Sequence, residues 1–214
     1  MATSRDFDMV DVATTTRSPL YRSVDLHGVS LVVNTAKGGG ECLFDSVKTI
    51  LASIGIEHTI PELRRMVANT VMKDTPKTND TIKTWCQVYL DAFRENDTDI
   101  LLEVAHVAKA ALSDDCLSKP SRLSIADEMM RASSYGNEYA LATFERTFGI
   151  TFIVVVPTMH KTEVPGTQGS LGTVNVVRDT GGGTIALLLL SSVHYVPLSD
   201  GADSFVWITK TPGF

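Results

Sequence analysis

The stretch "AKGGGECLFDSVKTILASIG", residues 36–55, places three glycines directly before a cysteine and the cysteine directly before a regularly spaced apolar segment. The spacing i, i+4, i+7, i+8 and i+11 of one helix face is occupied by Leu43, Val47, Ile50, Leu51 and Ile54. The pattern predicts a helix that begins near Cys42 and ends at Gly55. Glycine lets a ligand approach the backbone closely, and a helix start offers unpaired N–H groups. We therefore expect a thiol with a lowered pKa beside donors for an oxyanion.

The overall composition is that of a globular domain with one large core. Hydrophobic residues make up 43% of the 214 residues and charged residues 21%. The net charge of −6 and the lack of a local Lys/Arg cluster argue against a nucleic-acid partner. The longest apolar run, "TIALLLLSSV", is too short to span a bilayer, so we expect no membrane partner. An acidic balance suits a basic protein partner, although ordinary solubility explains it equally well.

The cysteine content indicates a reducing compartment. Cys42, Cys86 and Cys116 form neither a disulfide framework nor a CxxC zinc motif. The N-terminal segment lacks the basic start and apolar core of a signal peptide. The sequence therefore predicts a cytoplasmic protein with no metal site.

The hydrophobic periodicity changes along the chain. Residues 1–22 are polar and aperiodic, which predicts a flexible arm before a single domain over 23–214. "VSLVV" (29–33) has the composition of a buried strand, and helical spacing then recurs over 61–71, 82–93, 101–112 and two stretches before Gly149. After Gly149 come five strand-like runs: "ITFIVVV", "GTVNVV", "TIALLLL", "HYVPL" and "SFVWITK". This order predicts an α+β domain, with helices packed around a mainly antiparallel sheet formed by the C-terminal third.

Cys42 is the strongest candidate for chemistry among the three cysteines. Cys86 lies on an apolar helix face typical of a core, and Cys116 lies beside two aspartates that would raise its pKa. By local features alone, the glycine turn before Cys42 is explained as well by structure as by reactivity. A nucleophilic cysteine needs a base, and His194 is the histidine that opens a strand, which is a rigid mount.

Three segments resemble, in order and approximate separation, the motif blocks of ovarian tumour (OTU) domain cysteine proteases. They are "GGGECLFDSV", "SYGNEYALATFERTFGITFIVV" and "IALLLLSSVHYVPL". In that family the first block reads roughly Asp-Gly-Asn-Cys-Leu-Phe-x-Ser, the second is an aromatic-Gly turn before a helix and a strand, and the third is an apolar strand followed by His-Tyr. The resemblance covers about residues 29–210. It implies a papain-like α+β fold.

The resemblance also implies an activity and the residues that carry it. OTU proteases hydrolyse the bond after the C-terminal glycine of ubiquitin or a ubiquitin-like modifier, and they need no cofactor. Cys42 matches the nucleophile and His194 the general base. The Cys42 amide belongs to the implied oxyanion-hole segment, and the remaining matches are the oxyanion-hole glycines and the residues beside the substrate channel: Gly39, Gly40, Tyr135, Gly136 and Glu138.

Three positions depart from the family's pattern. Gly39 stands where the family usually has aspartate, and its backbone N–H can still act as a donor. Asp45 replaces a basic or polar residue, and the sequence offers no reason for the change. The position two residues after the histidine usually holds Asp or Asn, and here it is Val196, which cannot accept the imidazole N–H.

The group that orients His194 is therefore expected upstream. We prefer Asn34, at a strand end, over Asp25, and a catalytic dyad without a third residue stays open. Residues 194–210 read as a hairpin that turns near Asp200–Gly201, and this hairpin would place Trp207 opposite His194.

Three functions remain open at this level. The first is a deubiquitinating cysteine protease. The second is a non-catalytic ubiquitin-binding module on the same fold, and the third is a viral polyprotein-processing protease. The divergent motifs suggest a viral or bacterial protein that acts in the host cytoplasm.

Overall fold

A computed structural model of the chain describes residues 23–73, 123, 126, 127, 129–136, 138–158, 171–180, 183–191, 194–202 and 204–208. The expected N-terminal arm, the helices expected over 82–93 and 101–112, and the cysteines Cys86 and Cys116 lie outside these residues. Within the described residues, no helix is long and apolar enough to cross a bilayer.

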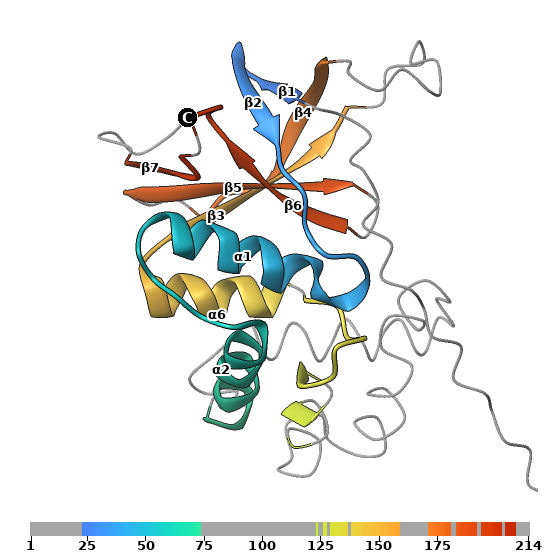
Figure 1. Cartoon of the computed structure of the whole chain (residues 1–214), viewed down its shortest axis with the longest axis vertical. Coiled ribbons are helices and arrows are strands. Elements are labelled where there is room, and N and C mark those ends of the chain that lie inside the picture. The colour runs from blue at the N-terminus through green and yellow to red at the C-terminus, as the bar shows by residue number, and fades with distance from the viewer. Residues whose placement is uncertain are drawn as a thin grey trace, which may run out of the picture.

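The described elements confirm the α+β class (Figure 1). The chain order is β1 (Ser23–Leu26), β2 (Val29–Val33), the 3₁₀ turn η1 (Gly39–Glu41), α1 (Cys42–Ser53), α2 (Ile60–Lys73), α6 (Glu138–Phe148), β3 (Thr151–Pro157), β4 (Leu171–Arg178), β5 (Thr184–Ser191), β6 (His194–Ser199) and β7 (Val206–Ile208). In Figure 1, α1 and α6 lie beneath the strands, and α2 lies below them.

The strands form a ring and not a simple layer. Their hydrogen-bonded order is β3-β4-β1-β2-β6-β5-β7, and an additional pairing of β3 with β5 closes the first six. The β1–β4 and β3–β5 pairs are parallel and the others are antiparallel. The expected mainly antiparallel sheet is confirmed. It is not built from the C-terminal third alone, because β1 and β2 complete the ring.

Strand β5 separates two hydrophobic clusters. Five consecutive residues, 185–189, are buried, because both faces of this strand are covered. Ile185, Leu187 and Leu189 point to the inside of the ring, and Ala186 and Leu188 point to the helices. On the helix side, Phe44 of α1 and Phe144 of α6 pack edge to face, with ring centroids 6.1 Å apart. Helix α1 is therefore fixed against both α6 and the sheet.

Helix α1 ends earlier than its sequence pattern predicts. Leu43, Val47, Ile50 and Leu51 are buried as expected, but the helix stops at Ser53 and Ile54 is 42% exposed. The N–H groups of Ile54 and Gly55 bond back to the carbonyls of Leu51 and Ala52, and Gly55 has φ +77. This left-handed glycine turns the chain away and takes Ile54 off the helix face.

The expected hairpin of β6 and β7 is wrong. The turn at Asp200–Gly201 does form, since Asp200 Oδ1 accepts the Ala202 N–H at 2.9 Å and Gly201 has φ +85. However, β7 pairs with β5, and Trp207 lies opposite Ile185 at the far end of β5 from the partner of His194. The physical reason is that β5 and β2 already occupy the two edges of β6.

Candidate active site

The first turn of α1 lies along the edge of β6 where β2 ends. The last backbone hydrogen bond along this edge joins the residue after β2 to β6: the Asn34 N–H donates to the Pro197 carbonyl at 3.1 Å. Nearer the start of β6, the N–H of Tyr195 donates to the Cys42 thiol group, and the Tyr195 carbonyl accepts from Ser46 Oγ at 3.2 Å. Cys42 and Ser46 are one helical turn apart and face the same side of the helix. Both side chains therefore bond to the backbone of the same β6 residue, Tyr195.

This arrangement brings the two predicted catalytic residues to one place. His194 directly precedes Tyr195 at the start of β6, and its Nε2 atom is buried. On β6, residues 194, 196 and 198 share one face. Val196 and Leu198 on that face belong to the hydrophobic cluster inside the ring, and Cys42 belongs to the same cluster. His194 is therefore the chain neighbour of the residue whose N–H bonds the Cys42 thiol.

The thiol is held in its neutral form by its surroundings. Cys42 is 1% exposed, and this burial raises its pKa above the ordinary value. The N–H groups of Tyr195, Leu43 and Cys42 and the positive charge of Arg64 act in the opposite direction but do not outweigh the burial. The expectation of a lowered thiol pKa is therefore wrong, because the sequence shows the helix start and not the depth at which it lies.

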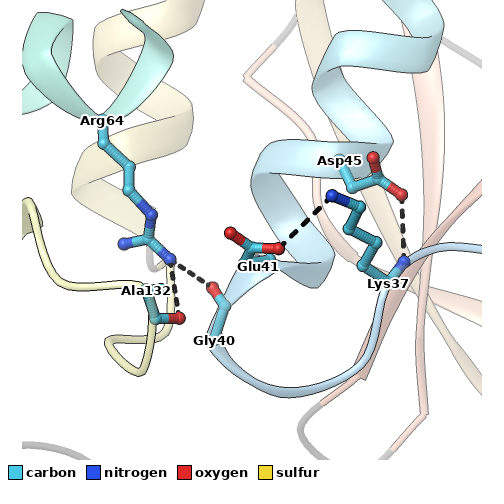
Figure 2. Close-up of polar contacts among 6 residues, drawn as sticks. All are labelled: Lys37, Gly40, Glu41, Asp45, Arg64 and Ala132. Atoms are coloured by element: carbon cyan, nitrogen blue, oxygen red, sulfur yellow. Dashed lines mark hydrogen bonds and ion pairs between the residues drawn. The ribbon is translucent and has the colours of Figure 1, made fainter. Parts of the chain in front are cut away.

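The loop before Cys42 is fixed by polar contacts at both ends (Figure 2). Asp45 Oδ2 accepts the Lys37 N–H at 2.9 Å, and the Lys37 ammonium lies 3.6 Å from the Glu41 carboxylate. Asp45, which the sequence left unexplained, thus closes this loop onto the first turn of α1. The Cys42 N–H donates to the Gly39 carbonyl within η1, so the structure gives this expected oxyanion donor a partner.

The two glycines expected in the oxyanion hole have different surroundings. Gly39 is exposed, has φ +66 and has open space where a Cβ would be. Gly40 is buried, and a Cβ there would lie 2.5 Å from the Ser133 carbonyl carbon and 2.6 Å from the Ala132 oxygen. Gly40 is therefore required by the close approach of the loop at 132–133.

A buried arginine on α2 contacts both of these loops (Figure 2). Arg64 is 2% exposed, and its Nη atoms donate to four carbonyl oxygens: Met129 (3.0 Å), Gly40 (2.9 Å), Ala132 (3.2 Å) and Ser134 (2.9 Å). Arg64 is not among the residues expected from the sequence. Its burial could have been predicted from helix periodicity. Arg64 lies four residues after Ile60 and four before Ala68, so it shares a helix face with two apolar residues, both of which are buried.

The three residues expected beside a substrate channel occupy different environments. Tyr135 is half-buried and packs against the cluster that contains Cys42. Gly136 is buried, and a Cβ there would collide with Leu43, 2.8 Å from its Cβ and closer still to its Cδ2. Glu138 is exposed at the start of α6. Tyr135 thus packs on the cluster that includes Cys42, whereas Gly136 packs against Leu43 of α1.

Asn34 and Asp25, the two residues expected to orient His194, make hydrogen bonds to other groups. Asn34 Nδ2 donates to Ser199 Oγ at 3.1 Å and to the Val32 carbonyl at 3.2 Å. Ser199 is an odd number of residues from His194 on β6, so the two side chains leave opposite faces. Asn34 therefore joins β2 to β6 on the face away from the imidazole.

Asp25 is farther away still. Its Oδ1 accepts the Gly28 N–H at 3.0 Å in the β1–β2 turn, and its strand partner is Ser30. Since the β2–β6 pairing begins only at Val32 and Ser199, Asp25 lies beyond the end of β6 that is remote from His194.

Nothing in the described part of the chain forms a metal site. There is no group there of three or more His, Cys, Asp or Glu side chains that could hold an ion. An open hollow of about 390 Å³ lies over the second half of α1 and the start of α2, lined by Lys48, Ala52, Glu57, His58, Thr59 and Glu62. This hollow is separate from Cys42.

Comparison with known proteins supports the fold. No family model matches the sequence, and no curated protein matches it. Among solved structures, an OTU domain in complex with ubiquitin matches with a TM-score of 0.52 at 14% identity, covering 89% of this chain and 84% of that chain. An OTU deubiquitinase from Wolbachia pipientis wMel bound to ubiquitin aligns at TM-score 0.48 and 16% identity, over 78% of this chain and 94% of that chain.

A viral OTU domain protease from Dera Ghazi Khan virus also aligns, at TM-score 0.40 and 15% identity, over 79% of this chain and 80% of that chain. The first of these matches establishes the class: the chain has the OTU fold, as its three sequence segments indicated. The ring of strands with α1 on its outside, beginning at Cys42, is this chain's version of that fold.

Proposed function

We propose that the protein is a cysteine-type deubiquitinase that hydrolyses the peptide or isopeptide bond after the C-terminal glycine of ubiquitin or a ubiquitin-like modifier. Cys42 is the nucleophile and His194 the general base. The observation that carries the proposal is the Cys42 thiol held by the N–H of Tyr195, the residue after His194. The OTU fold supports it, since a solved OTU domain of that fold is in complex with ubiquitin.

The raised thiol pKa determines how the first step proceeds. Because burial keeps Cys42 protonated, a neutral His194 imidazole removes the thiol proton as the sulfur attacks the glycine carbonyl carbon. The tetrahedral intermediate collapses to a thioester, and the imidazolium gives its proton to the departing lysine amine. Water, deprotonated by the same imidazole, then attacks the thioester and releases the glycine carboxylate and the thiol. Such thiol chemistry suits the cytoplasm.

The oxyanion of the intermediate needs preorganised N–H donors. The Cys42 N–H is bonded to the Gly39 carbonyl, so we assign this role to the N–H groups of Gly39 and Gly40. The contact of Gly40 with the loop at 132–133 supports this assignment, because it fixes the peptide units before the nucleophile.

We propose a Cys42–His194 dyad in preference to a triad with Asn34. The Asn34 amide is bonded to Ser199 and Val32, on the opposite face of β6 from the imidazole. Asn34→Ala should therefore change kcat by less than about threefold, whereas loss of a true orienting group lowers kcat by about 10⁴-fold. Steady-state kinetics of Asn34→Ala and Asp25→Ala on a fluorogenic ubiquitin substrate distinguish the two.

A non-catalytic ubiquitin-binding module is the second candidate. Cys42 is 1% exposed and its thiol is neutral, and Val196 occupies the position where the family usually has Asp or Asn. These features favour a protein that keeps the ubiquitin surface without turnover.

Labelling with ubiquitin that carries a C-terminal electrophile separates the two candidates. The enzyme should form a covalent adduct that is lost in Cys42→Ala and retained in Cys86→Ala and Cys116→Ala. A wild-type protein that binds ubiquitin without forming the adduct would establish the module. Equal labelling of Cys42→Ala would show that the nucleophile is wrongly assigned.

A further inference from the structure

Arg64 is a buried cation whose hydrogen bonds converge on the site. Moving a charge out of water is unfavourable unless the charge is well bonded, and a guanidinium carries five N–H donors in a planar fork. Two of its nitrogen atoms make four bonds to carbonyl oxygens, each 2.9–3.2 Å long. The position of these carbonyls shows which parts of the chain the charge holds.

The four carbonyls belong to the loop directly before Cys42 and to a second segment that packs against that loop. One is Gly40, in the nucleophile loop (Lys37–Glu41), and three are in the 129–134 segment that leads to Tyr135. The two loops also touch directly, since a Cβ on Gly40 would lie 2.5 Å from the Ser133 carbonyl carbon. The Arg64 hydrogen bonds and the close packing of Gly40 thus join the same two segments.

Helix α1 is tied to the same guanidinium. The Arg64 Cζ atom lies 4.2 Å from the centroid of the Phe44 ring, within the range of a cation–π contact. Phe44 is fully buried and is separated from Cys42 by one residue. The Arg64 side chain therefore touches the loop before Cys42, the helix that begins at Cys42 and the 129–134 segment.

The bond to Gly40 also fixes the direction of the next donor. A peptide unit is planar and trans, so the Gly40 carbonyl and the Glu41 N–H point in opposite directions. With the carbonyl held on Arg64, the Glu41 N–H can point only away from α2. The backbone entering Cys42 is thereby limited to one orientation.

We infer that Arg64 is a positioning residue that joins the nucleophile loop to the 129–134 segment and so sets the placement of Cys42. The inference deepens the proposed function and rests on it for the identity of the nucleophile. Arg64 does not touch the reacting atoms in this role; it acts through Gly40 and Phe44. Its positive charge also lowers the thiol pKa, against the effect of burial.

The inference predicts that arginine is required and that charge alone is insufficient. Lysine is a point charge with three donors on one atom and cannot bridge carbonyls on two loops in the geometry of the fork. Arg64→Lys should therefore lose positioning while it keeps most of the electrostatic effect, and Arg64→Met should lose both.

The test measures alkylation of Cys42 by iodoacetamide against pH, with Cys86 and Cys116 replaced by serine, together with kcat and KM on a fluorogenic ubiquitin substrate. Arg64→Met should move the alkylation midpoint to higher pH, because the charge that favours the thiolate is gone. Both variants should lower kcat, by up to about 10²-fold for a displacement near 1 Å, with a smaller change in KM.

Val67→Ala and Arg65→Met are the matched controls. Val67 is fully buried on the same helix, so its truncation lowers stability without touching either loop, and Arg65 is an exposed neighbouring charge. A pH profile and kcat in both Arg64 variants equal to those of Val67→Ala would overturn the inference. So would failure of even Arg64→Lys to fold, because the role would then be global stability.

The outcomes also separate this inference from the proposed function. If the wild type alkylates with the expected profile and Arg64→Met shifts it, but ubiquitin is not hydrolysed, the positioning role stands and the deubiquitinase proposal fails. If ubiquitin is hydrolysed and neither Arg64 variant affects kcat or the pH profile of alkylation, the deubiquitinase proposal stands and the positioning role of Arg64 fails.

Discussion

The starts of α1 and α2 differ in how their N–H groups are satisfied. At α2, Thr59 and Glu62 form a reciprocal capping box: the Thr59 N–H donates to Glu62 Oε2 at 2.7 Å, and the Glu62 N–H donates to Thr59 Oγ1 at 3.3 Å. At α1, in the part of the chain that the structure describes, the side chain of the N-cap residue Glu41 makes no capping hydrogen bond. The N–H groups of its first turn face the thiol and the η1 turn instead.

The α2 start is stabilised by local contacts, and the α1 start by tertiary contacts. The α2 start is complete within four consecutive residues. The α1 start depends on Tyr195 of β6, on Arg64 of α2 and on the loop at 132–133. We therefore expect the start of α2 to respond only to changes in its own cap, and the thiol at α1 to respond to changes far away in the sequence.

Among changes at the two helix starts, the largest effect is expected from Gly40→Ala. The added methyl group meets backbone atoms of Ala132 and Ser133 that cannot move aside easily, so stability should fall by about 1–3 kcal/mol. Because the loop before Cys42 must shift, turnover should fall by about 10²-fold. Urea unfolding and ubiquitin hydrolysis measure the two effects.

Gly39→Ala is the control for that prediction. Its site has open space but a φ of +66, so it should lose about 1 kcal/mol from left-handed strain and no close contact. Equal losses in the two variants would mean that the approach of the 132–133 loop is unimportant.

Ser46→Ala should have the next largest effect. It leaves the Tyr195 carbonyl without its bond to Ser46 Oγ, which should lower stability by about 1–3 kcal/mol and slow alkylation of Cys42. Ser53→Ala, at the other end of α1, removes a hydroxyl that donates within the helix, to the Ile50 carbonyl. If Ser53→Ala slows alkylation as much as Ser46→Ala does, the docking of α1 on β6 is not what holds the thiol.

Thr59→Ala should affect stability alone. Loss of the cap typically destabilises a protein by about 1 kcal/mol. The alkylation rate and pH profile of Cys42 should stay at wild-type values, since the box makes its bonds within α2. A shifted thiol profile in Thr59→Ala would break the distinction between the two helix starts.

The smallest effect is a pH dependence at the α2 cap. The Thr59 N–H and hydroxyl bonds lower the pKa of the Glu62 carboxyl below its ordinary value. A carboxyl with a lowered folded-state pKa stabilises the protein above its unfolded-state pKa, and this contribution is lost as the pH falls through the folded-state value. The Tm difference between wild type and Glu62→Gln should therefore be present at neutral pH and vanish in acid. A difference that is unchanged in acid would contradict the assignment.

The parts of the fold that could be predicted from the sequence are those with a local signature. The buried face of α1 follows from its 3.6-residue period, and the strands after Gly149 follow from short β-branched runs. The proximity of Cys42 and His194 was available only from the motif resemblance. The structure gives it a physical basis in the bonds of Cys42 and Ser46 to Tyr195.

The parts that could not be predicted depend on contacts between distant residues. The position of β7 depends on which sheet edges are free, and the thiol pKa depends on the depth at which α1 begins. The carbonyls held by Arg64 lie 24 to 70 residues away in the chain. No local pattern around Gly40 or Ser134 indicates that they share one guanidinium.

The central claim, that the start of α1 delivers Cys42 to His194, is tested most directly by His194→Ala. Its kcat for hydrolysis of a fluorogenic ubiquitin amide is measured together with its affinity for ubiquitin, with His58→Ala as the control because His58 lies in the separate hollow. We expect turnover in His194→Ala to be lower than in the wild type by about 10³-fold or more, with ubiquitin binding and stability retained, and turnover in His58→Ala to be unchanged. Turnover in His194→Ala within about threefold of wild type would contradict it.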